Sequence, residues 1–542
     1  MLVGSGINSL ACAALLARAG WSVCVLERNE WLGGAIRTAE ISAPGFHHDV
    51  FSAWHPLWLG GPANALLGEE LAARGLSYLN TELPTASVSV EGDAAFLLRN
   101  ASANVAEFER HGTGDGAAWQ AFLDTFLANA DLSFGLLGTE LWSWAGGALF
   151  LRALRRLGRY GMHEFAGNLL ASSRDWLAGS FASEAVRGLL APWVLHSGLG
   201  PDAASSGFMT QVIGVAIQEG GMPIPRGGGS KLPEALVGLI TDAGGQCRTG
   251  AEVASVVLRD GRAIGVATVE GETLGARRAV IANVTPTQLY GRLLGDPGGA
   301  IARAGRRFRY GRAEMQIHFA LSEPPLWRGD ERLSRTAIVH LTPGLDGVSR
   351  AVNEAERGLL PAEATVVCGQ PLTIDESRAP RGAGLLWIQL QELPWRVRGD
   401  AGGELDVGAG GWTEELREAY ADRIQRRLGA HIANLDSALL ARVSLSPADL
   451  ARANPNLERG DPYAGSLSLD QNFLWRPFPG QPGHRTAVEA LWQIGASTWP
   501  GPGLGAGSGT LVANELLRPS LSERLARRLR PGRAGGSAEA PL

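Results

Sequence analysis

The stretch VGSGINSL, residues Val3 to Leu10, places two glycines one residue apart directly after a short apolar segment. The residues INSLACAALLARAG carry apolar side chains at helical spacing and end at Gly20, and WSVCVLER is typical of a second buried strand. A strand, a glycine turn, a helix and a strand in this order predict a βαβ unit that opens an α/β domain.

The glycine turn has the features of a dinucleotide site. Gly4 and Gly6 let a diphosphate approach backbone N–H groups at the start of a helix, where the helix dipole favours negative charge. Ser9 takes the place of the usual third glycine, which predicts a slightly wider spacing of helix and strand. The turn alone would equally suit a structural role. Glu27 ends the second strand, where a carboxylate can accept hydrogen bonds from both ribose hydroxyls and repel the 2'-phosphate of NADP. The glycine turn and Glu27 together predict dinucleotide binding.

The first strand is short. Only three residues precede Gly4, whereas a strand usually has about five. Either the start lies a few residues late or the strand is unusually short. A truncated central strand loses ladder hydrogen bonds and buried apolar area, so in the first case an upstream extension is expected to raise stability or cofactor occupancy.

Composition sets the class of protein. A chain of 542 residues with 45% hydrophobic and 19% charged residues predicts a globular protein of two or more domains. The net charge of -5 gives no reason to expect nucleic acid as a partner. The four cysteines form no C-x-x-C pair, so we expect neither disulfides nor a metal site. The N-terminus lacks a signal peptide and no apolar run spans a bilayer, which predicts a cytoplasmic protein.

The residues after Glu27 distinguish FAD from NAD. In ERNEWLGGAIRT the pair Gly33 and Gly34 follows the ribose carboxylate, and here the sequence resembles the FAD enzymes of the phytoene desaturase and amine oxidase superfamily. The resemblance extends over nearly the whole chain. PRGGGSKLPEAL is similar to the family's second glycine turn and helix, AEVASV to its adenine-side segment, and RRAVIAN to its return strand. The resemblance implies FAD as the cofactor, and since no flavin-attachment feature is evident in the sequence we expect it to be bound noncovalently.

The C-terminal half resembles one branch of the superfamily. YAGSLSLDQNFLWRPFP and LWQIGASTWPGPGLGAGSGT are similar to the phytoene-dehydrogenase-like branch, which includes bacterial carotenoid desaturases and one type of β-carotene ketolase. In that branch the segment matching Gly495 to Gly509 lies along the ribityl chain and the flavin ring. A helix from near Thr510 would aim its N-terminal dipole at the flavin pyrimidine edge. The residues implied in FAD binding are Gly4, Gly6, Ser9, Glu27, Arg28, Gly33, Gly34, Ala35, Val253, Gly495, Ala496, Gly503, Gly505 and Ala506.

The expected fold is α/β, with a Rossmann-like FAD-binding domain and a second, mixed α+β substrate domain, both discontinuous in sequence. We assign residues 1–80, 225–295 and 480–530 to the FAD-binding domain. Residues 81–224 and 296–479 are assigned to the substrate domain, which begins with helical patterns from about residue 100 to 200. Residues 531–542 are expected to be a disordered tail.

The resemblance implies an FAD-dependent dehydrogenase (desaturase) of a lipophilic, isoprenoid-like substrate. For a hydrocarbon, catalysis is mostly placement of a C–H bond about 3–3.5 Å from flavin N5 in a dry cavity. No second strand-GxGxxG-helix unit is present, which favours oxygen or a quinone as electron acceptor. Ketolase-type oxygenation, redox-neutral isomerisation, amine oxidation and a flavin-binding protein without turnover are the alternatives.

Three residues are catalytic candidates. His196 lies in a stretch that resembles a family segment near the substrate, where it could accept the proton lost beside the hydride; a buried histidine bonded to backbone is the structural alternative. His55, with Asp49, follows the FAD loop and could face the flavin or belong to a packed turn. Trp499 stands where the family more often has histidine, and could roof the cavity or pack beside Pro500.

The segment ALFLRALRRLGRY predicts an amphipathic basic helix. Arg152, Arg155, Arg156 and Arg159 follow helical spacing on one face, with the leucines directed elsewhere. Such a face could dock the protein peripherally on an anionic membrane that holds the substrate. The alternative is an arginine face in solvent on a helix packed against the core.

Overall fold

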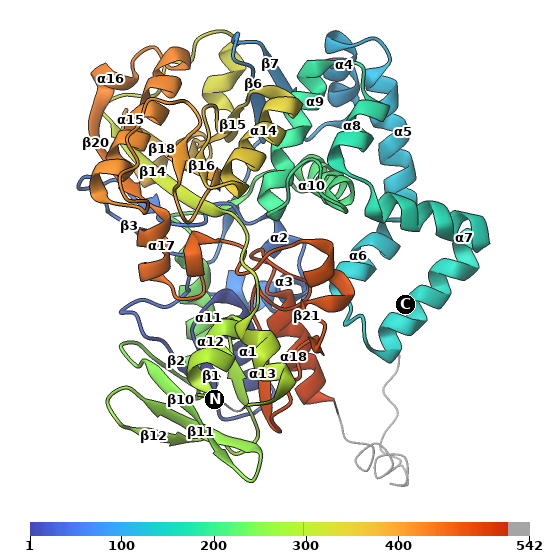
Figure 1. Ribbon diagram of the computed structural model, residues 1–542, viewed down its shortest axis with the longest axis vertical. Coiled ribbons are helices and arrows are strands. Elements are labelled where there is room, and N and C mark those ends of the chain that lie inside the picture. Colours follow the sequence, from blue (N-terminus) through green and yellow to red (C-terminus); the bar gives the residue numbers. More distant parts are fainter. Residues whose placement is uncertain (296–297, 519–542) are drawn as a thin grey trace, which may run out of the picture.

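The computed structural model describes residues 1–295 and 298–518. Figure 1 shows a parallel sheet in the lower half, beside the N-terminus, and a larger sheet in the upper half. The long helix α7 (Trp144–Leu170) projects at the right-hand side of this view. The two sheets and this projection organise the site described below.

The lower sheet is parallel throughout, in the order β23-β13-β1-β2-β9. Its strands are β1 (Leu2–Val3), β2 (Cys24–Leu26), β9 (Gln246–Arg248), β13 (Val280–Ala282) and β23 (Leu491–Gln493). The short β1 is the central strand, and helix α1 (Ile7–Arg18) connects it to its parallel neighbour β2. The predicted βαβ unit is therefore confirmed.

Alternating side chains give this sheet two apolar faces, as a sheet buried on both sides requires. Leu2, Val25 and Ile281 pack against helices on one face. Those helices are α1, α3 (Pro62–Ala72), α11 (Lys231–Asp242) and α18 (Gly507–Leu517). Val3 and Val280 pack on the other face against an antiparallel meander. The meander consists of β10 (Val253–Arg259), β11 (Arg262–Thr268) and β12 (Thr273–Gly275).

The upper sheet has seven strands in the order β20-β14-β18-β17-β15-β6-β7. They are β6 (Thr85–Val88), β7 (Ala94–Leu97), β14 (Ala313–Leu321), β15 (Ile338–Leu341), β17 (Val366–Gly369), β18 (Gly384–Leu393) and β20 (Leu439–Leu445). Only the pair β6–β15 is parallel among these neighbours. One face packs on α15 (Glu414–His431). The other faces a helical layer and the dinucleotide-binding half.

The helical layer is formed by the region that the sequence predicts to be helical. It contains α4 (Ala101–His111), α5 (Asp115–Ala128), α6 (Ala130–Gly138), α8 (Ser173–Ser180), α9 (Glu184–Leu190) and α10 (Ser206–Gly220). Further helices lie between strands: α2 (Pro56–Leu59), α12 (Pro286–Gln288), α13 (Gly299–Arg306), α14 (Gly344–Glu356), α16 (Leu435–Ala438) and α17 (Pro447–Ala453). Within residues 1–295 and 298–518 no helix combines the length and apolar character needed to cross a bilayer.

The predicted α/β class, with a Rossmann-like sheet and a second mixed domain, is confirmed. The domain boundaries remain our proposal. In their support, the five parallel strands all lie within 1–80, 225–295 and 480–530, and the seven strands of the upper sheet all lie within 81–224 and 296–479. The predicted tail, 531–542, lies outside the described residues.

Candidate functional site

The glycine turn after β1 forms a cradle that side chains would fill. Gly4 has a φ of +83°, and a Cβ on Gly6 would lie 2.9 Å from Nδ2 of Asn283. The second glycine loop lies against the first, because Gly6 and Gly33 form a parallel bridge and a Cβ on Gly34 would lie 3.0 Å from Cα of Gly6. The N-terminus of α1 follows directly, so backbone N–H groups meet an open space suited to a diphosphate.

Glu27 is buried at the end of β2 and fixes the first loop. Its Oε2 accepts hydrogen bonds from N (2.9 Å) and Oγ (2.7 Å) of Ser5, and Oε1 accepts one from N of Asn29 (3.0 Å). The Ser5 hydroxyl oxygen in turn accepts a bond from N of Gly33 (3.1 Å). A carboxylate has about four acceptor positions, so one position, on Oε1, is left for a ribose hydroxyl rather than the two that the sequence suggests.

Three further residues predicted for the FAD site, Ser9, Arg28 and Val253, lie near this cradle. Ser9 is fully buried, and its hydroxyl has no hydrogen-bond partner within the described chain. Glu252, beside Val253, lies 4.0 Å from Nε of Arg28 and 3.0 Å from Nη1 of Arg292. Arg292 also donates to the carbonyl of Val253 (3.2 Å). Arg292 and Asn283 line the same cavity and carry no motif that would single them out in the sequence.

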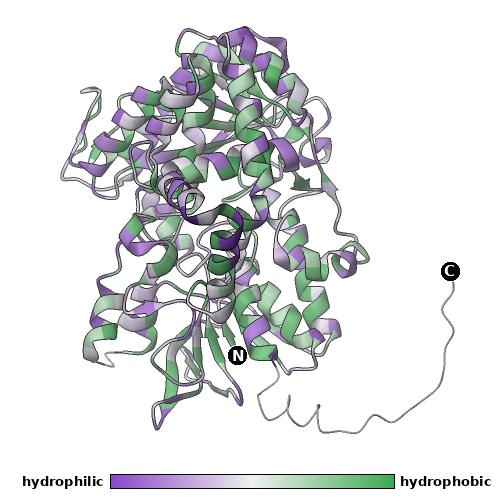
Figure 2. Ribbon diagram, turned by 90° about the vertical axis from the view of Figure 1, so that its right-hand side faces the viewer, coloured by the Kyte–Doolittle hydropathy of each residue, from purple (hydrophilic) through white to green (hydrophobic). Residues whose placement is uncertain are grey.

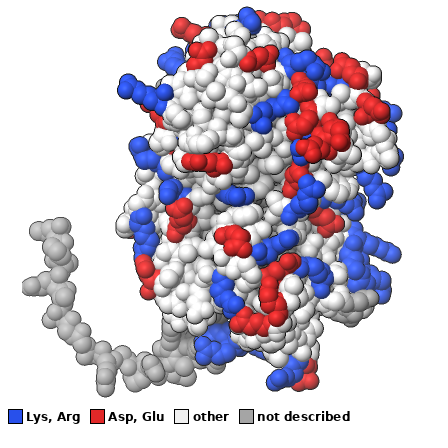
Figure 3. All heavy atoms as spheres, turned by 90° about the vertical axis from the view of Figure 1, so that its left-hand side faces the viewer, with Lys and Arg blue, Asp and Glu red and all other residues white. Residues whose placement is uncertain are grey.

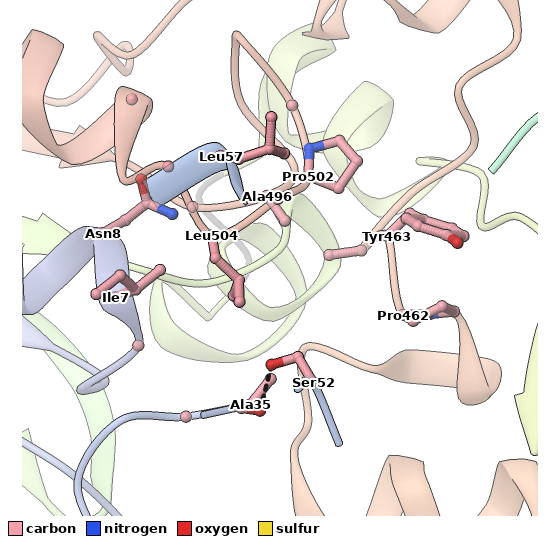
Figure 4. A pocket seen from close by; sticks show the side chains of 18 of the residues that line it. Ile7, Asn8, Ala35, Ser52, Leu57, Pro462, Tyr463, Ala496, Pro502 and Leu504 are labelled. Atoms are coloured by element: carbon pink, nitrogen blue, oxygen red, sulfur yellow. Dashed lines mark hydrogen bonds between the residues drawn. The ribbon is translucent and has the colours of Figure 1, made fainter. Parts of the chain in front are cut away.

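The C-terminal glycine segment forms the facing wall. N of Gly495 donates to Oγ of Ser508 (3.0 Å), and a Cβ on Gly503 would lie 2.6 Å from Cδ1 of Leu57. Figure 4 shows Leu57, Ala496 and Leu504 around the space that Ala35 and Ser52 close from below. Ala506 adopts a φ of +53° as the N-cap of α18, which begins three residues before the predicted Thr510.

These loops open into one large cavity of about 990 Å³. Its dinucleotide end is lined by the glycine segments, by Glu27 and by Val253. Its other end lies between the two sheets and is mostly apolar. The apolar lining residues are Trp54, Phe134, Leu137, Trp193, Met209, Val212, Ile213, Ala216, Ile338, Trp387, Leu467 and Phe473. A cavity with a backbone cradle at one end and an apolar chamber at the other suits a dinucleotide cofactor beside an apolar substrate.

Comparison with known proteins identifies the family. A profile of the family described as flavin containing amine oxidoreductase matches residues 10–401. The chain belongs to this family. It is an FAD oxidoreductase, and the resemblance to the phytoene desaturase and amine oxidase superfamily is confirmed. The glycine cradle, the acidic residue after β2 and the C-terminal loop fit FAD, because added Cβ atoms at Gly6, Gly34 or Gly503 would fill the cradle or collide with its walls.

Several members of this flavoprotein family match almost the full chain. "Pyridine nucleotide-disulfide oxidoreductase domain-containing protein 2" from Mus musculus is 26% identical, over 96% of this chain and 93% of that protein. The "zeta-carotene-forming phytoene desaturase" of Myxococcus xanthus is 25% identical, over 93% and 90% of the two chains. The solved structure of cyclohexylamine oxidase from Brevibacterium oxydans has a TM-score of 0.55 at 15% identity, over 95% and 99% of the two chains, and shows the shared fold.

In this flavin oxidoreductase, His196 lines the chamber. Its Nε2 lies 3.2 Å from Nε2 of the buried His340, and the ring of Trp193 lies 4.6 Å from its own. Burial lowers the pKa of His196 to about 3. The imidazole is therefore neutral near pH 7 and a weak proton acceptor.

His55 lies behind the cavity wall. It precedes α2, its Nδ1 lies 3.1 Å from Oη of Tyr78, and it is absent from the cavity lining. Burial lowers the pKa of His55 to about 4. Asp49 bonds to N of Gly229 (2.9 Å) and pairs with the buried Arg378 (3.0 Å), an arrangement that fixes the loop. We therefore give neither residue a part in the chemistry proposed below.

Trp499 is buried and lines the chamber beside Phe473, at a ring separation of 5.5 Å. Its Nε1 donates to the carbonyl of Thr139 (2.8 Å), and its own carbonyl lies 2.9 Å from Nε2 of His484. His484 is also paired with Glu140 (2.5 Å). These contacts tie the chamber wall to the segment that connects α6 to α7.

One polar cluster in the chamber is not evident from the sequence. Glu314 on β14 is buried, and its carboxylate accepts hydrogen bonds from the amides of Gln316 (2.6 Å) and Gln389 (2.7 Å). All three residues, called the Glu314 cluster below, line the cavity. Burial raises the pKa of Glu314 to about 7, although the hydrogen bonds from the two amides stabilise the carboxylate and lower the pKa. Within the described ranges no group of three or more His, Cys, Asp or Glu side chains could hold a metal ion.

Proposed function

We propose that this FAD oxidoreductase dehydrogenates an apolar, isoprenoid-like substrate and introduces a carbon–carbon double bond. The observation that carries the proposal is the continuity of the cavity from the glycine cradle to a chamber walled by aromatic and aliphatic side chains. The name of the Myxococcus relative, a phytoene desaturase, supports the same chemistry.

FAD, when bound, supplies a two-electron acceptor for a hydride. The chain's part is placement: Trp54 and Trp387, with rings 5.2 Å apart, and the aliphatic residues of α10 hold the substrate and exclude water. We propose the fourteen positions given above for the FAD site, with Glu27 at the ribose. Twelve of them line the cavity, whereas Ser9 and Ala506 are buried behind its wall and would support the loops that bind FAD. Oxygen or a quinone remains our proposed acceptor, since the sequence holds no second glycine-rich nucleotide unit.

Anaerobic mixing of the FAD-loaded protein with candidate substrates tests this function. Loss of the oxidised flavin absorbance and a product two hydrogens lighter support it. An oxygen-containing product formed in air indicates ketolase-type oxygenation. A product of unchanged mass indicates isomerisation, and an aldehyde product indicates amine oxidation. Ala216→Trp, which fills the chamber, should retain FAD and lose flavin reduction, whereas Ala72→Trp, at an exposed position of α3, should retain both.

We further propose that α6 and α7 dock the enzyme on an anionic membrane that holds its substrate. Ala153 is the one buried residue of α7, so this helix is not packed on the core as the alternative requires. Trp144 is 97% exposed and Tyr160 83%, and Leu151 and Leu154 of the same helix are also exposed. Figure 2 looks onto this side and shows hydrophobic residues among hydrophilic ones on its helices.

The basic residues of α7 complement an anionic surface. Arg152, Arg155 and Arg159 form no ion pair with any described residue, whereas Arg156 pairs with Asp131 (2.6 Å). A non-helical backbone at Gly158 kinks the helix, so the predicted single face is broken before its last arginine. On the opposite face of the molecule, basic and acidic side chains are intermixed (Figure 3). The position of α7 also suits substrate uptake, because Phe134 of the adjoining α6 both lines the cavity and is 45% exposed.

Vesicle binding tests the docking proposal. Each arginine near an anionic surface contributes about 1 kcal/mol, so changing Arg152, Arg155 and Arg159 to glutamine should weaken binding on the order of 100-fold at low salt. The vesicles contain phosphatidylcholine with or without phosphatidylglycerol. The control variant makes the same charge change at three exposed arginines outside α7: Arg426, Arg452 and Arg485. Equal binding by the α7 variant and this control contradicts the proposal.

A further inference from the structure

The Glu314 cluster lies where the two halves of the cavity meet. β14 and β18 pair with Gln316 opposite Gln389, so both amides and the carboxylate share the sheet face that carries Trp387. The same amide nitrogen of Gln316 that donates to Glu314 also donates to the carbonyl of Phe51 (2.7 Å). Phe51, Ser52 and Ala53 line the cavity and belong to the segment behind the second glycine loop. The carboxyl group is thus held at the boundary between the cofactor loops and the apolar chamber.

The partners of Glu314 differ from those of Asp49, another buried carboxylate. Asp49, which fixes a loop, is paired with a buried arginine at 3.0 Å. Glu314 has no Lys, Arg or His ion-pair partner in the described part of the chain. Two neutral amides hold it, so neither its charged nor its neutral form is fixed by an opposite charge. A carboxyl group with such surroundings can take up and release a proton without breaking an ion pair.

Two other titratable groups face the cluster, and neither carries a compensating charge. Asp461 accepts hydrogen bonds from backbone N–H groups of Gly311 (2.7 Å), Tyr463 (2.8 Å) and Gly465 (2.9 Å). Burial raises the pKa of Asp461 against these hydrogen bonds and the nearby Arg476, and an ionised Asp461 raises the pKa of Glu314. The phenol of Tyr463 donates to the carbonyl of Leu195 (2.7 Å), and burial holds its pKa well above the usual range. Of this set, Glu314 is the carboxyl group that lines the cavity.

We propose that Glu314 is the catalytic residue that accepts the proton released by the substrate during dehydrogenation. This inference rests on the proposed function. One substrate C–H bond gives its hydrogen and both electrons to FAD, the oxidant. The neighbouring C–H bond breaks, its electron pair forms the carbon–carbon double bond, and its proton bonds to a carboxylate oxygen of Glu314. His196, neutral and hydrogen-bonded to His340, is the weaker base in the same chamber.

Infrared difference spectroscopy of the FAD-loaded full chain tests the inference without turnover. The difference between wild type and Glu314→Gln should contain the C=O band of a protonated carboxyl group at acidic pH, and this band should disappear as the pH rises through about 7. Phytoene in detergent micelles should shift it. The matched control is Glu392→Gln: Glu392 is equally buried, accepts bonds from Thr365, has its pKa raised by burial to about 7, and does not line the cavity. Phytoene should leave the Glu392 band in place.

Reductive half-reaction kinetics supply the second measurement. The rate of flavin reduction by phytoene in wild type should rise with pH to a plateau above about 7, since the carboxylate form is required. Glu314→Gln should retain FAD but reduce it roughly 10²- to 10⁴-fold more slowly and without this pH dependence. Glu392→Gln should keep the wild-type profile.

The two proposals fail in different ways. An unchanged rate and pH profile in Glu314→Gln overturns the inference and leaves the proposed function intact. If phytoene and other isoprenoid probes do not reduce wild-type flavin, the proposed function fails. The infrared measurement does not depend on turnover: a Glu314 band that does not titrate near neutral pH overturns the role of this residue. Where phytoene reduces the flavin, a Glu314 band that does not respond to phytoene overturns it as well.

Discussion

Replacing Glu27 by alanine tests the ribose end of the FAD site. Of about four acceptor positions on a carboxylate, three are used by Ser5 and Asn29, and one on Oε1 is free. One hydrogen bond to a charged group contributes about 1.5–3 kcal/mol. The FAD Kd of Glu27→Ala should therefore rise by roughly 10- to 150-fold.

Glu27→Gln makes the test sharper. Its amide NH₂ group must face either the two donors of Ser5 or the N–H of Asn29, and two donors cannot share a hydrogen bond, so we expect a loss close to that of alanine. FAD is titrated into apoprotein and the quenching of its fluorescence gives the Kd. Glu392→Gln, a buried change outside the cavity, should keep the wild-type Kd. A Kd within about twofold of wild type for both Glu27 variants would refute the reasoning.

Two further predictions concern stability. A Cβ on Gly509 would lie 2.0 Å from the carbonyl oxygen of Asn8, so Gly509→Ala should force α18 and α1 apart and lower the Tm. The control is Gly167→Ala in α7: a Cβ at Gly167 has open space around it, so this change should maintain or raise the Tm. The folded-state pKa values of Glu314 and Glu392 are raised from about 4.5 to about 7, so the stability linked to each is fully present below pH 4.5 and is lost as the pH rises to 7. The Tm of each glutamine variant relative to wild type should therefore increase across this window, and a constant difference would contradict the assigned burial effect.

The dinucleotide half of the molecule is largely predictable because its signals are local. Gly4, Gly6 and Glu27 lie within one βαβ unit, and the turn, the helix and the acidic strand end each require their residue types at fixed spacing. The C-terminal loop is recognisable for a similar reason, since its glycines stand where side chains would collide with Leu57 or Asn283.

The chemistry of the chamber depends on long-range pairing and is harder to predict. Along β14 the polar residues Glu314, Gln316 and His318 alternate with apolar ones, a pattern that usually marks a solvent-facing side of a strand. In the structure that side is fully buried and faces the cofactor loops. Only the packing of the distant segment at Val50 and Phe51 against β14 turns this ordinary alternation into a buried polar cluster.

Helix α7 shows the opposite limitation. Its arginine spacing is visible in sequence, but the ion pair of Arg156 with Asp131 and the kink at Gly158 are not. A prediction from residue spacing treats the helix as continuous and isolated. In the structure the helix is broken at Gly158, and Asp131 of α6 pairs with Arg156.

The strand order of the parallel sheet has a consequence for biosynthesis. The central β1 leaves the ribosome before the other four strands of its sheet, but its neighbour β13 ends at Ala282 and the next strand, β23, at Gln493. Contacts between such distant segments form slowly, and a nascent chain that stops before β23 exposes the edge of β13. Gly495 and α18 are made even later, so the FAD cradle is completed only after α18 has been synthesised. Free FAD thus stabilises selectively the chains that include α18, and chains interrupted before it are exposed to aggregation or proteolysis.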